Sequence, residues 1–347
     1  MISKIISLEH FTIFAQYQTI QDEVMKYALL FLLFFGLWGC SDNTIENPAI
    51  INEEEFTDMR RCYSHEHLQT QLLADPMLAY RMQEIEDFTQ SILSDKSPKA
   101  LYLSGDSIVI PVVVNVLYKT SAQNISTAQI QSQIDILNKD FQALNSDYNQ
   151  TPAQFQSVRS GDTKIVFVLE TINRKSTTKV SWKTDNSMKM TSKGGLNPTS
   201  PTTKLNIWVC NLSGGILGYA QFPGGSTSTD GIVVDDNAFG DIGTVQSPYN
   251  KGRTATHEVG HWMNLRHIWG DATCGNDLVS DTPSHNAANY GCPTFPHYST
   301  CSGSPVEMTM NYMDYTDDAC MYMFTIGQKN RMRAIFAAGG PRYSFGQ

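Results

Sequence analysis

The chain has 347 residues, and its 25 lysines and arginines against 34 aspartates and glutamates give a formal net charge of -9 at pH 7. This acidic balance argues against nucleic acid as a partner and suits a secreted domain with basic substrates. The length leaves room for a short N-terminal extension and one domain of two subdomains, and no internal repeat is evident.

The N-terminal 40 residues resemble an export signal. Residues 28–39 form an apolar run that is too short to span a bilayer and is typical of a signal-peptide core. The run leads into Leu37-Trp38-Gly39-Cys40, which resembles a bacterial lipoprotein box. We therefore expect a signal peptide over 1–40, with Met25 as an alternative start. Cys40 would be the lipidated first residue and the protein's link to the membrane of the cell envelope or surface.

A polar segment, residues 41–98, follows and is predicted to be a pro-segment. Ile85, Phe88 and Ile92 recur at helical spacing and indicate one amphipathic helix near its end. Residues 94–99 form a polar linker and a plausible cleavage region. The main domain is then expected over 99–347.

The first elements of this domain are a strand and a helix. Apolar residues run almost unbroken over Ile108–Tyr118, which predicts a buried strand. Ser126 and Gln129 form a capping box at the start of a helix. Apolar residues recur on one face of this helix, at Ile130, Ile134, Leu137, Phe141 and Leu144.

Further strands are expected at 164–170, 205–209 and 231–235, and helices at 254–264 and 327–337. Between these two helices, residues 267–320 are loop-rich. This order predicts an α/β (α+β) fold with a mixed-sheet upper subdomain, an irregular disulfide-stapled lower subdomain and a cleft between them.

Three histidines and one glutamate occur in the run His257-Glu258-Val259-Gly260-His261-Trp262-Met263-Asn264-Leu265-Arg266-His267. His257 and His261 share a helix face, so both imidazoles reach one zinc ion, and Thr254 is available as the N-cap. His267 is too distant to share that face, so the helix must end near Asn264. Three protein ligands leave a fourth position open, which is the pattern of a catalytic zinc site, and Glu258 is placed to polarise a water.

This spacing resembles that of the metzincin metallopeptidases. Those enzymes usually carry glycine where Asn264 stands, and asparagine is the next residue in tolerating a left-handed backbone. Metzincins also have a methionine turn beneath the metal, and Asn311-Tyr312-Met313-Asp314-Tyr315 resembles it, with Met313 as the apolar floor. A buried methionine alone is more often core filler.

Within the metzincins, the chain resembles the pappalysins over roughly 108–336. The likeness rests on the zinc motif, on 311–320, and on Leu205–Asn211 followed by Gly218–Pro223. It implies an endopeptidase of the small microbial type that acts on proteins or peptides. A catalytically silent, zinc-containing surface binding lipoprotein is the alternative, against which Glu258 and Tyr315 argue.

The resemblance also assigns roles to two residues near the methionine turn. Tyr315 resembles the family tyrosine that stabilises the oxyanion, although a packed tyrosine is a comparable reading. Asp318 resembles the aspartate at the base of the pocket for the residue after the cut, which implies cleavage before arginine or lysine. A turn carboxylate that caps local backbone is the other reading of Asp318, and the adjacent Asp317 could exchange roles with it.

Four cysteines lie around the active-site motifs, and in an exported chain they are expected to form disulfides. Their spacing permits three pairings, and the family resemblance favours Cys274–Cys301 and Cys292–Cys320. A second zinc site is the rival reading, but no Cys-x-x-Cys pair is present.

Cys210 lies in an apolar strand pattern and is expected to be a buried thiol. Cys62 lies in the pro-segment and resembles the family cysteine that blocks the zinc, so we expect it to hold the enzyme latent as a zymogen. An exposed thiol of no consequence is the other reading.

The segment Asp277-Leu278-Val279-Ser280-Asp281-Thr282 is dense in oxygen ligands. Similar loops of the small pappalysins hold calcium, and hard oxygen donors suit that ion. Asp277, Asp281 and Thr282 are the candidate calcium ligands beside the zinc cofactor, although such loops are commonly plain turns.

Overall fold

The computed structural model describes residues 62–94 and 105–346. The expected signal peptide, Cys40 and all but the first residue of the expected cleavage region, 94–99, lie outside these residues. Within the part described, no helix has both the length and the apolar character needed to cross a membrane.

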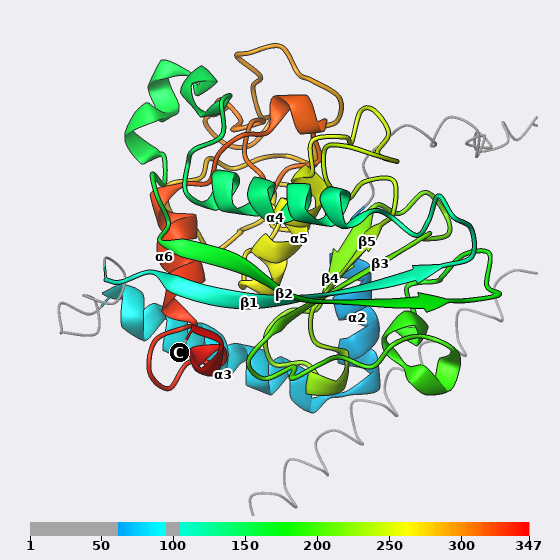
Figure 1. Cartoon of the computed structure of the whole chain (residues 1–347). Coiled ribbons are helices and arrows are strands. Elements are labelled where there is room, and N and C mark those ends of the chain that lie inside the picture. Colours follow the sequence, from blue (N-terminus) through cyan, green and yellow to red (C-terminus); the bar gives the residue numbers. More distant parts are fainter. Residues whose placement is uncertain (1–61, 95–104, 347) are drawn as a thin grey trace, which may run out of the picture. The chain divides into compact units, whose positions relative to one another are not determined.

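The centre of the fold is a five-stranded mixed sheet with the order β2-β1-β3-β5-β4 (Figure 1). The four strands β2, β1, β3 and β5 pair in parallel, and β4 is antiparallel to β5. Because β4 pairs on one side only, its outer edge is open to another chain segment. The strands are β1 (Ile108–Tyr118), β2 (Ile165–Ser176), β3 (Leu205–Cys210), β4 (Gly218–Ala220) and β5 (Ile232–Asp235).

Strands β1, β3 and β5 are apolar because both of their faces are covered. One face packs with Val112, Val114 and their neighbours in the main core, and the other packs around Trp208 and Tyr219. The expected strand over Ile108–Tyr118 has the bounds that the sequence indicated. Strand β2 is longer than expected and continues to Ser176.

Helices α4 (Thr127–Phe141) and α5 (Arg253–Trp262) pack on the main-core face of the sheet. Ser126 caps α4 by accepting from the Gln129 backbone N–H at 3.0 Å. Only this half of the expected capping box forms, since the Gln129 side chain donates to the Phe239 carbonyl instead. The expected Leu144 lies beyond the end of α4 and is exposed.

Two helices precede the sheet, α2 (Ser64–Ala74) and α3 (Met77–Ser94), where the sequence indicated one. Helix α3 carries the expected Ile85, Phe88 and Ile92 and packs on α6 (Ile326–Ala334). Glu86 of α3 forms a two-point ion pair with Arg331 of α6, at 2.9 and 2.5 Å. The same Arg331 side chain donates to the Asn264 carbonyl at 2.8 Å, so it links α3 to the end of α5.

The lower part of the domain, from His267 to Cys320, contains almost no regular structure among its described residues, as expected. Helix α6 begins at Ile326 and ends at Ala334, three residues before the expected end. Short 3-10 helices connect the other elements, at Tyr148–Gln150, Ala153–Val158, Ser187–Lys189, Thr191–Lys193, Thr227–Thr229, Asp318–Cys320 and Tyr343–Gly346.

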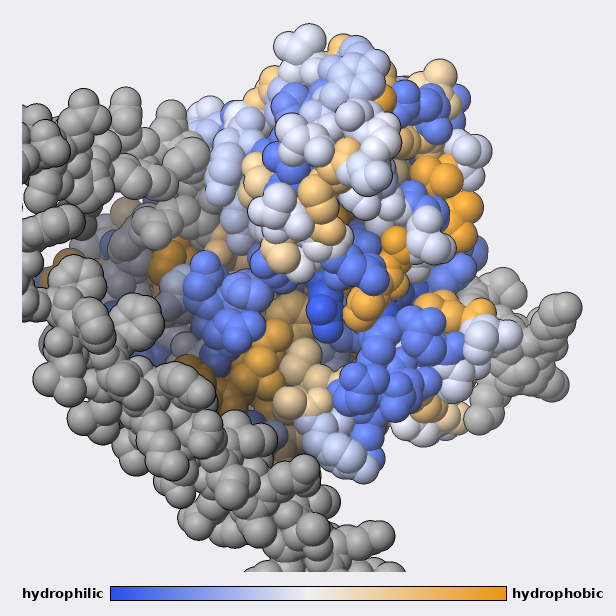
Figure 2. Space-filling model, turned by 180° about the vertical axis from the view of Figure 1, so that it is seen from behind, coloured by the Kyte–Doolittle hydropathy of each residue, from blue (hydrophilic) through white to orange (hydrophobic). Residues whose placement is uncertain are grey.

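The exposed large hydrophobic side chains belong to separate elements, among them Leu73 in α2, Leu144 after α4 and Val180 after β2. On the face seen in Figure 2, hydrophobic residues lie among hydrophilic ones. Scattered exposure of this kind is normal for a folded domain and requires no partner.

Candidate metal centre

Helix α5 carries two histidines whose side chains converge, and it ends directly after the second of them. His257 and His261 are one turn apart and fully buried. The helix ends at Trp262, and Asn264 has the left-handed φ of 71° that the turn requires. The expected N-cap, Thr254, is wrong, because it lies inside the helix and Gly252 takes the cap position with a φ of 70°.

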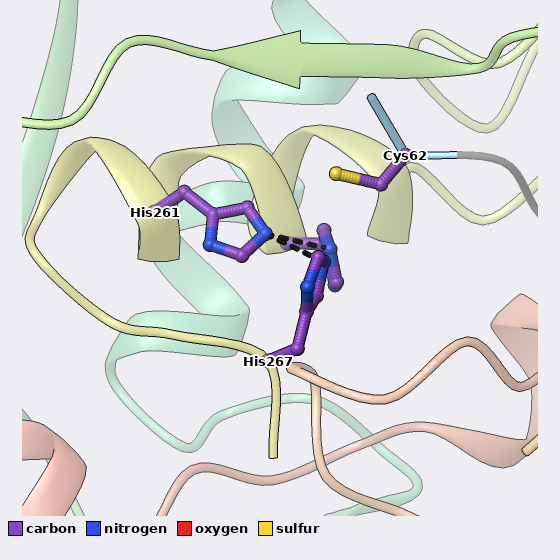
Figure 3. Close-up of side chains that lie close together, drawn as sticks. Cys62, His261 and His267 are labelled. Carbon is purple, nitrogen blue, oxygen red and sulfur yellow. Dashed lines mark hydrogen bonds between the residues drawn. The ribbon is translucent and has the colours of Figure 1, made fainter. Parts of the chain in front are cut away.

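The chain then returns and brings His267 to the same point as the helix histidines. His261 Nε2 lies 3.1 Å from His257 Nε2 and 3.0 Å from His267 Nε2. Cys62, which precedes α2, points its sulfur into this group from the other side (Figure 3). The four ligand atoms all lie within 4.8 Å of one another.

The other ring nitrogen of each histidine has an acceptor. His257 Nδ1 donates to the Tyr312 carbonyl at 2.7 Å, and His261 Nδ1 to the Leu265 carbonyl at 2.8 Å. His267 Nδ1 donates to Asp271. Burial alone would raise the pKa of Asp271, but His267 and the other nearby imidazoles lower it to about 2, so Asp271 is a carboxylate.

These contacts fix the tautomers and provide a test of whether the donor set fits a metal. Because each Nδ1 carries the proton, the three Nε2 lone pairs face a common centre, where they repel one another unless a cation lies between them. Tetrahedral zinc places its ligand nitrogens about 3.4 Å apart, close to the separation found here. Burial lowers the pKa of His261 to about 3, so this imidazole is neutral, as a ligand must be.

Glu258 lies next to this centre and contacts the segment that precedes and begins α2. Its Oε2 accepts a hydrogen bond from Ser64 Oγ at 2.7 Å and a longer one from the Cys62 thiol at 3.5 Å. Burial raises the pKa of that thiol, and the Glu258 carboxylate raises it further. Ser64 could not be predicted from the sequence, because a lone serine in a polar segment carries no pattern.

The same segment occupies the open edge of β4. The Tyr63 N–H donates to the Gly218 carbonyl at 3.0 Å, and the Ala220 N–H donates to Ser64 Oγ at 2.8 Å. These are the backbone groups that an added strand would use.

Tyr315 packs beside the histidines of the metal centre. Its ring packs against His267 and Trp269, and Trp269 in turn stacks on His267 with ring centroids 4.3 Å apart. The Tyr315 hydroxyl donates to the Cys62 carbonyl at 3.1 Å. Burial raises the pKa of Tyr315, so the phenol keeps its proton and remains a donor.

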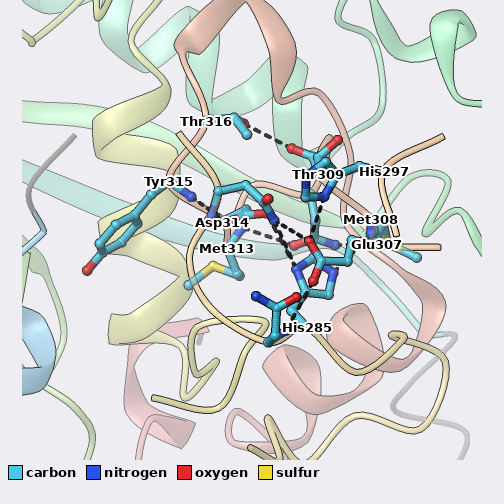
Figure 4. Close-up of polar contacts among 12 residues, drawn as sticks. His285, His297, Glu307, Met308, Thr309, Met313, Asp314, Tyr315 and Thr316 are labelled. Atoms are coloured by element: carbon cyan, nitrogen blue, oxygen red, sulfur yellow. Dashed lines mark hydrogen bonds and ion pairs between the residues drawn. The ribbon is translucent and has the colours of Figure 1, made fainter. Parts of the chain in front are cut away.

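Met313, the methionine of the expected turn, packs against the zinc-motif helix at Gly260. A Cβ atom added to Gly260 of α5 would lie 2.5 Å from the Met313 sulfur, so the turn packs directly on the helix. Behind Met313, a buried network holds the turn (Figure 4). Asp314 Oδ1 accepts from the Asn289 N–H and the Tyr315 N–H, both at 2.8 Å.

Asp318 is fully buried at the start of α5. Its Oδ2 accepts from the Lys251 N–H at 2.8 Å and the Arg253 N–H at 3.2 Å, so it caps the zinc-motif helix from a distant part of the chain. Asp318 therefore caps local backbone and is at the same time a buried acidic side chain beside the zinc-motif helix.

The disulfides join Cys274 to Cys301 and Cys292 to Cys320, the two pairs that the family resemblance implied. Cys210 is a buried free thiol, as expected. Asp277 is buried and accepts from Thr282 Oγ1 at 3.0 and 2.9 Å. Asp281 instead accepts from Thr325 Oγ1 at 2.7 Å and the Gly327 N–H at 2.8 Å, at the start of α6.

The sheet packs on a helix that carries two buried histidines, a third histidine follows a left-handed turn, and a methionine packs against the same helix. Together these features define a metallopeptidase of the metzincin class. Comparison with known proteins gives the family. The chain belongs to the M43 peptidases, the pappalysins, whose model, described as pregnancy-associated plasma protein-A, matches residues 200–337.

Curated relatives agree with this assignment. An extracellular metalloprotease of Arthroderma benhamiae is 33% identical over 262 residues, which cover 73% of this chain and 86% of that protein. An extracellular metalloprotease of Verticillium alfalfae is 35% identical over 240 residues, which cover 67% of this chain and 78% of that protein.

Two solved structures have the same fold. Mature mirolysin of Tannerella forsythia, in complex with a cleaved peptide, is 46% identical with a TM-score of 0.67, and the match covers 70% of this chain and 96% of that chain. A mutant of promirolysin from the same organism is 42% identical with a TM-score of 0.75 and covers 83% and 97%. The chain is thus a metalloprotease, as the sequence predicted.

Proposed function

We propose that this metalloprotease is an exported zinc endopeptidase made as a latent precursor. In it, His257, His261 and His267 hold the zinc ion, and Glu258 is the general base. The observation that carries the proposal is the convergence of three buried imidazole nitrogens on one point whose fourth side is taken by Cys62.

Zinc at this point would lower the pKa of a water molecule to near 7 and polarise the scissile carbonyl. Glu258 would take the proton of that water and deliver it to the leaving amine. Tyr315 would donate its hydrogen bond to the developing oxyanion. The support for this role is that its hydroxyl already donates to a carbonyl oxygen, that of Cys62, at 3.1 Å.

The substrate would bind as an added strand on the outer edge of β4, using the Gly218 carbonyl and the Ala220 N–H. Residues 41–98, the proposed pro-segment, would prevent this in the precursor. Cys62 blocks the metal, Ser64 occupies both Glu258 and the Ala220 N–H, and Tyr63 occupies the Gly218 carbonyl. The match to promirolysin, which covers more of this chain than the match to mature mirolysin, supports a zymogen.

Cleavage before arginine or lysine would depend on Asp318. The support is a fully buried carboxylate that two backbone N–H groups hold in place beside α5. A fixed carboxylate recognises a guanidinium by paired hydrogen bonds and an ammonium as a point charge.

A calcium ion is proposed at the loop that begins with Asp277. Burial raises the pKa of this carboxyl to about 6, and its nearest partner, Thr282, is neutral. A bound calcium would stabilise the ionised form. Asp281 contributes less, because its carboxylate holds the start of α6. Loss of activity with a calcium-selective chelator, restored by calcium but not by zinc, is the expected result.

Export is supported by the relatives, which are named extracellular metalloproteases. The signal peptide over 1–40 and a lipid anchor at Cys40 remain part of the proposal. Labelling of the precursor with a radioactive fatty acid, abolished by Cys40→Ser, is the expected outcome, and labelling that persists would remove the anchor from the account.

The decisive experiment uses activated enzyme, with the pro-segment removed, and a proteome-derived peptide mixture read by mass spectrometry. Cuts before arginine and lysine, absent in Glu258→Ala, are expected. Asp318→Asn should lose the preference for basic residues while keeping the helix cap, and Asp317→Asn is the matched control. Equal products from the wild type and Glu258→Ala would favour a silent zinc-binding lipoprotein.

A further inference from the structure

A hollow of about 560 Å³ lies between the helices of the proposed pro-segment and the main domain. One of its walls comes from α2 and α3. The other wall belongs to the main domain and includes Phe222, Asn264, Asp271 and Arg331. We call this hollow the Arg331 pocket. Removal of the pro-segment would uncover its second wall as an open groove.

The main-domain wall of the Arg331 pocket borders the metal centre. The ring centroids of Phe222 and His261 are 5.2 Å apart, and Asp271 accepts from His267 Nδ1. Asn264 stands in the left-handed turn that joins these two histidines. Three residues of the wall thus contact or connect the histidines of the metal centre, so a peptide bound there would also reach the groove.

Helix α5 separates this pocket from Asp318. Asp318 accepts from the backbone at the first turn of α5, whereas Asn264 follows its last turn. The helix has ten residues and is about 15 Å long, with His257 and His261 between its ends. An extended peptide advances about 3.3 Å per residue. With the residue after the cut beside Asp318, the pocket faces a residue within about five positions before the cut.

Glu86 of α3 shows which chemistry the pocket binds. Its carboxylate accepts from both terminal nitrogens of Arg331, at 2.9 and 2.5 Å, while Arg331 Nε donates to the Asn264 carbonyl at 2.8 Å. Burial alone would raise the pKa of Glu86, but Arg331 and Arg266 hold it below its usual value, so Glu86 is ionised. Two-point pairs of this kind are specific for a carboxylate. Without the pro-segment, the anchored guanidinium of Arg331 would lose this partner and keep its charge.

Asn264 supplies a second donor on the same wall. It is 7% exposed, and its Nδ2 has no hydrogen-bond partner within residues 62–94 and 105–346. A buried N–H group without an acceptor is costly, and a carboxylate that pairs with Arg331 still has lone pairs to accept from it. Metzincins usually have glycine at this position, so the zinc motif itself does not require the amide.

The other charged groups of the pocket are compatible with one bound carboxylate. Arg266 is exposed and adds positive charge. Asp271 is ionised, but its partners are the histidines at the end next to the metal. Burial raises the pKa of Asp277 to about 6, although Thr282 and the charge of Arg331 lower it, and both of its oxygens accept from Thr282. Glu86 therefore remains the carboxylate that forms a two-point pair with Arg331.

We propose that the Arg331 pocket is a substrate subsite for an acidic side chain, aspartate or glutamate, on the N-terminal side of the cut. Glu86 fills the subsite in the precursor. In the mature enzyme a substrate carboxylate takes its place and pairs with the Arg331 guanidinium and the Asn264 amide. This inference rests on the proposed peptidase function. It gives the cleft opposite requirements at the two ends of α5, an acidic residue beside Arg331 and a basic residue beside Asp318.

The test uses activated enzyme and peptides with a fixed arginine after the cut and five randomised positions before it. Among the cleaved peptides, one position should be enriched several-fold in aspartate and glutamate. The readout is the ratio of acidic to alanine peptides, so that a general loss of activity cancels. Asn264→Gly, which suits the left-handed turn, should lower this ratio about two- to tenfold. Arg331→Gln should lower it about tenfold or more, and Arg331→Lys should restore part of it.

Arg174→Gln is the matched control, because Arg174 also donates to a carbonyl oxygen, that of Ile125, outside the pocket. Its ratio should equal that of the wild type. Absence of an acidic preference at every position, as expected if Arg331 turns to Asp277 in the mature enzyme, would overturn the inference. An acidic preference that survives both Asn264→Gly and Arg331→Gln would overturn it as well.

A competition series separates this failure from that of the peptidase itself. A labelled peptide of residues 62–94 is bound to activated Glu258→Ala enzyme and displaced by short peptides. Each peptide carries glutamate or glutamine at one of the five positions before the arginine. At one position glutamate should compete several-fold better than glutamine, and Arg331→Gln should remove the difference. Equal competition at all five positions overturns the subsite, whereas failure of the wild type to cleave any peptide overturns the peptidase alone.

Discussion

At the scale of single residues, Ser64 makes two of the contacts on which the proposed latency depends. Its hydroxyl bridges the Glu258 carboxylate, at 2.7 Å, and the Ala220 N–H, at 2.8 Å. In the proposed zymogen Cys62 would block the metal position, whereas Ser64 contacts both Glu258, the proposed general base, and the edge of β4. Latency in this account therefore has two adjacent determinants with separate chemistry.

Replacing Ser64 by alanine should weaken latency without touching the metal ligands. A hydrogen bond to a charged group contributes about 1.5–3 kcal/mol, so precursor carrying Ser64→Ala should activate itself roughly tenfold faster or more. The rate of appearance of the shortened chain measures this. Thr70→Ala is the control, because the Thr70 hydroxyl donates only within α2. Identical rates for the two variants would contradict the role of Ser64.

Tyr315 is expected to act on the transition state rather than on binding. Removing an oxyanion donor usually costs about 10²–10³ in kcat. Tyr315→Phe should therefore lower kcat by roughly that factor and leave KM nearly unchanged, in steady-state hydrolysis of one peptide. Tyr290→Phe, whose ring lies 6.0 Å from that of Tyr315, is the control. A rise in KM at constant kcat would make Tyr315 a binding residue instead.

At the scale of elements, the methionine turn packs directly on α5 at Gly260, next to His261. Gly260 leaves just enough room for the Met313 sulfur, since an added Cβ would come within 2.5 Å of it. Gly260→Ala should thus destabilise the fold by about 1–3 kcal/mol through overpacking. Thermal unfolding of Glu258→Ala and Gly260→Ala/Glu258→Ala, which avoids self-digestion, measures the difference. Adding Met313→Ala should restore part of the lost stability. Equal Tm values for Glu258→Ala and Gly260→Ala/Glu258→Ala would show that the methionine turn accommodates the added methyl group without cost.

Docking of α2 should depend on pH through His67. Lys189 and the Tyr219 ring face this imidazole, whose pKa is about 3 when docked, against an ordinary value near 6.5. A pKa lowered in the docked state means that docking is fully stabilised above pH 6.5 and weakens as the pH falls toward 3. At pH 5 the docked form should be roughly thirtyfold less favoured than at pH 8.

The measurement is binding of the 62–94 peptide to Glu258→Ala enzyme from pH 8 to pH 5. Burial lowers the pKa of Lys189 to about 7, within the same range, so His67→Gln, which stays neutral, isolates the contribution of His67. The ratio of the affinities at pH 8 and pH 5 should be roughly thirtyfold smaller for this variant than for the wild-type peptide. An unchanged slope would show that His67 does not control docking.

At the scale of the whole molecule, the sequence predicted the features that leave a periodic or spaced pattern. The apolar run from Ile108 to Tyr118 has the same first and last residue as β1, because both faces of that strand are covered. The spacing of His257, His261 and His267 required a helix that ends near Asn264, and it does. The disulfide pairs came from the family resemblance, since spacing alone left three choices.

The missed features depend on contacts between distant parts of the chain. Helix α2 buries Ser64 and His67, both polar, so hydrophobic patterning could not find it. The N-cap position of the zinc-motif helix is Gly252 rather than Thr254, and Asp318, more than sixty residues later, accepts from the backbone there. No local signal marks any of these residues.

The central claim is a latent zinc centre made of Cys62 and three histidines. X-ray absorption at the zinc edge tests it most directly, on zinc-loaded Glu258→Ala precursor and on the same protein after removal of the pro-segment. The account predicts one zinc per chain with one sulfur and three nitrogen ligands in the precursor, and loss of the sulfur after removal. A precursor zinc with no sulfur ligand, or no bound zinc, would contradict it.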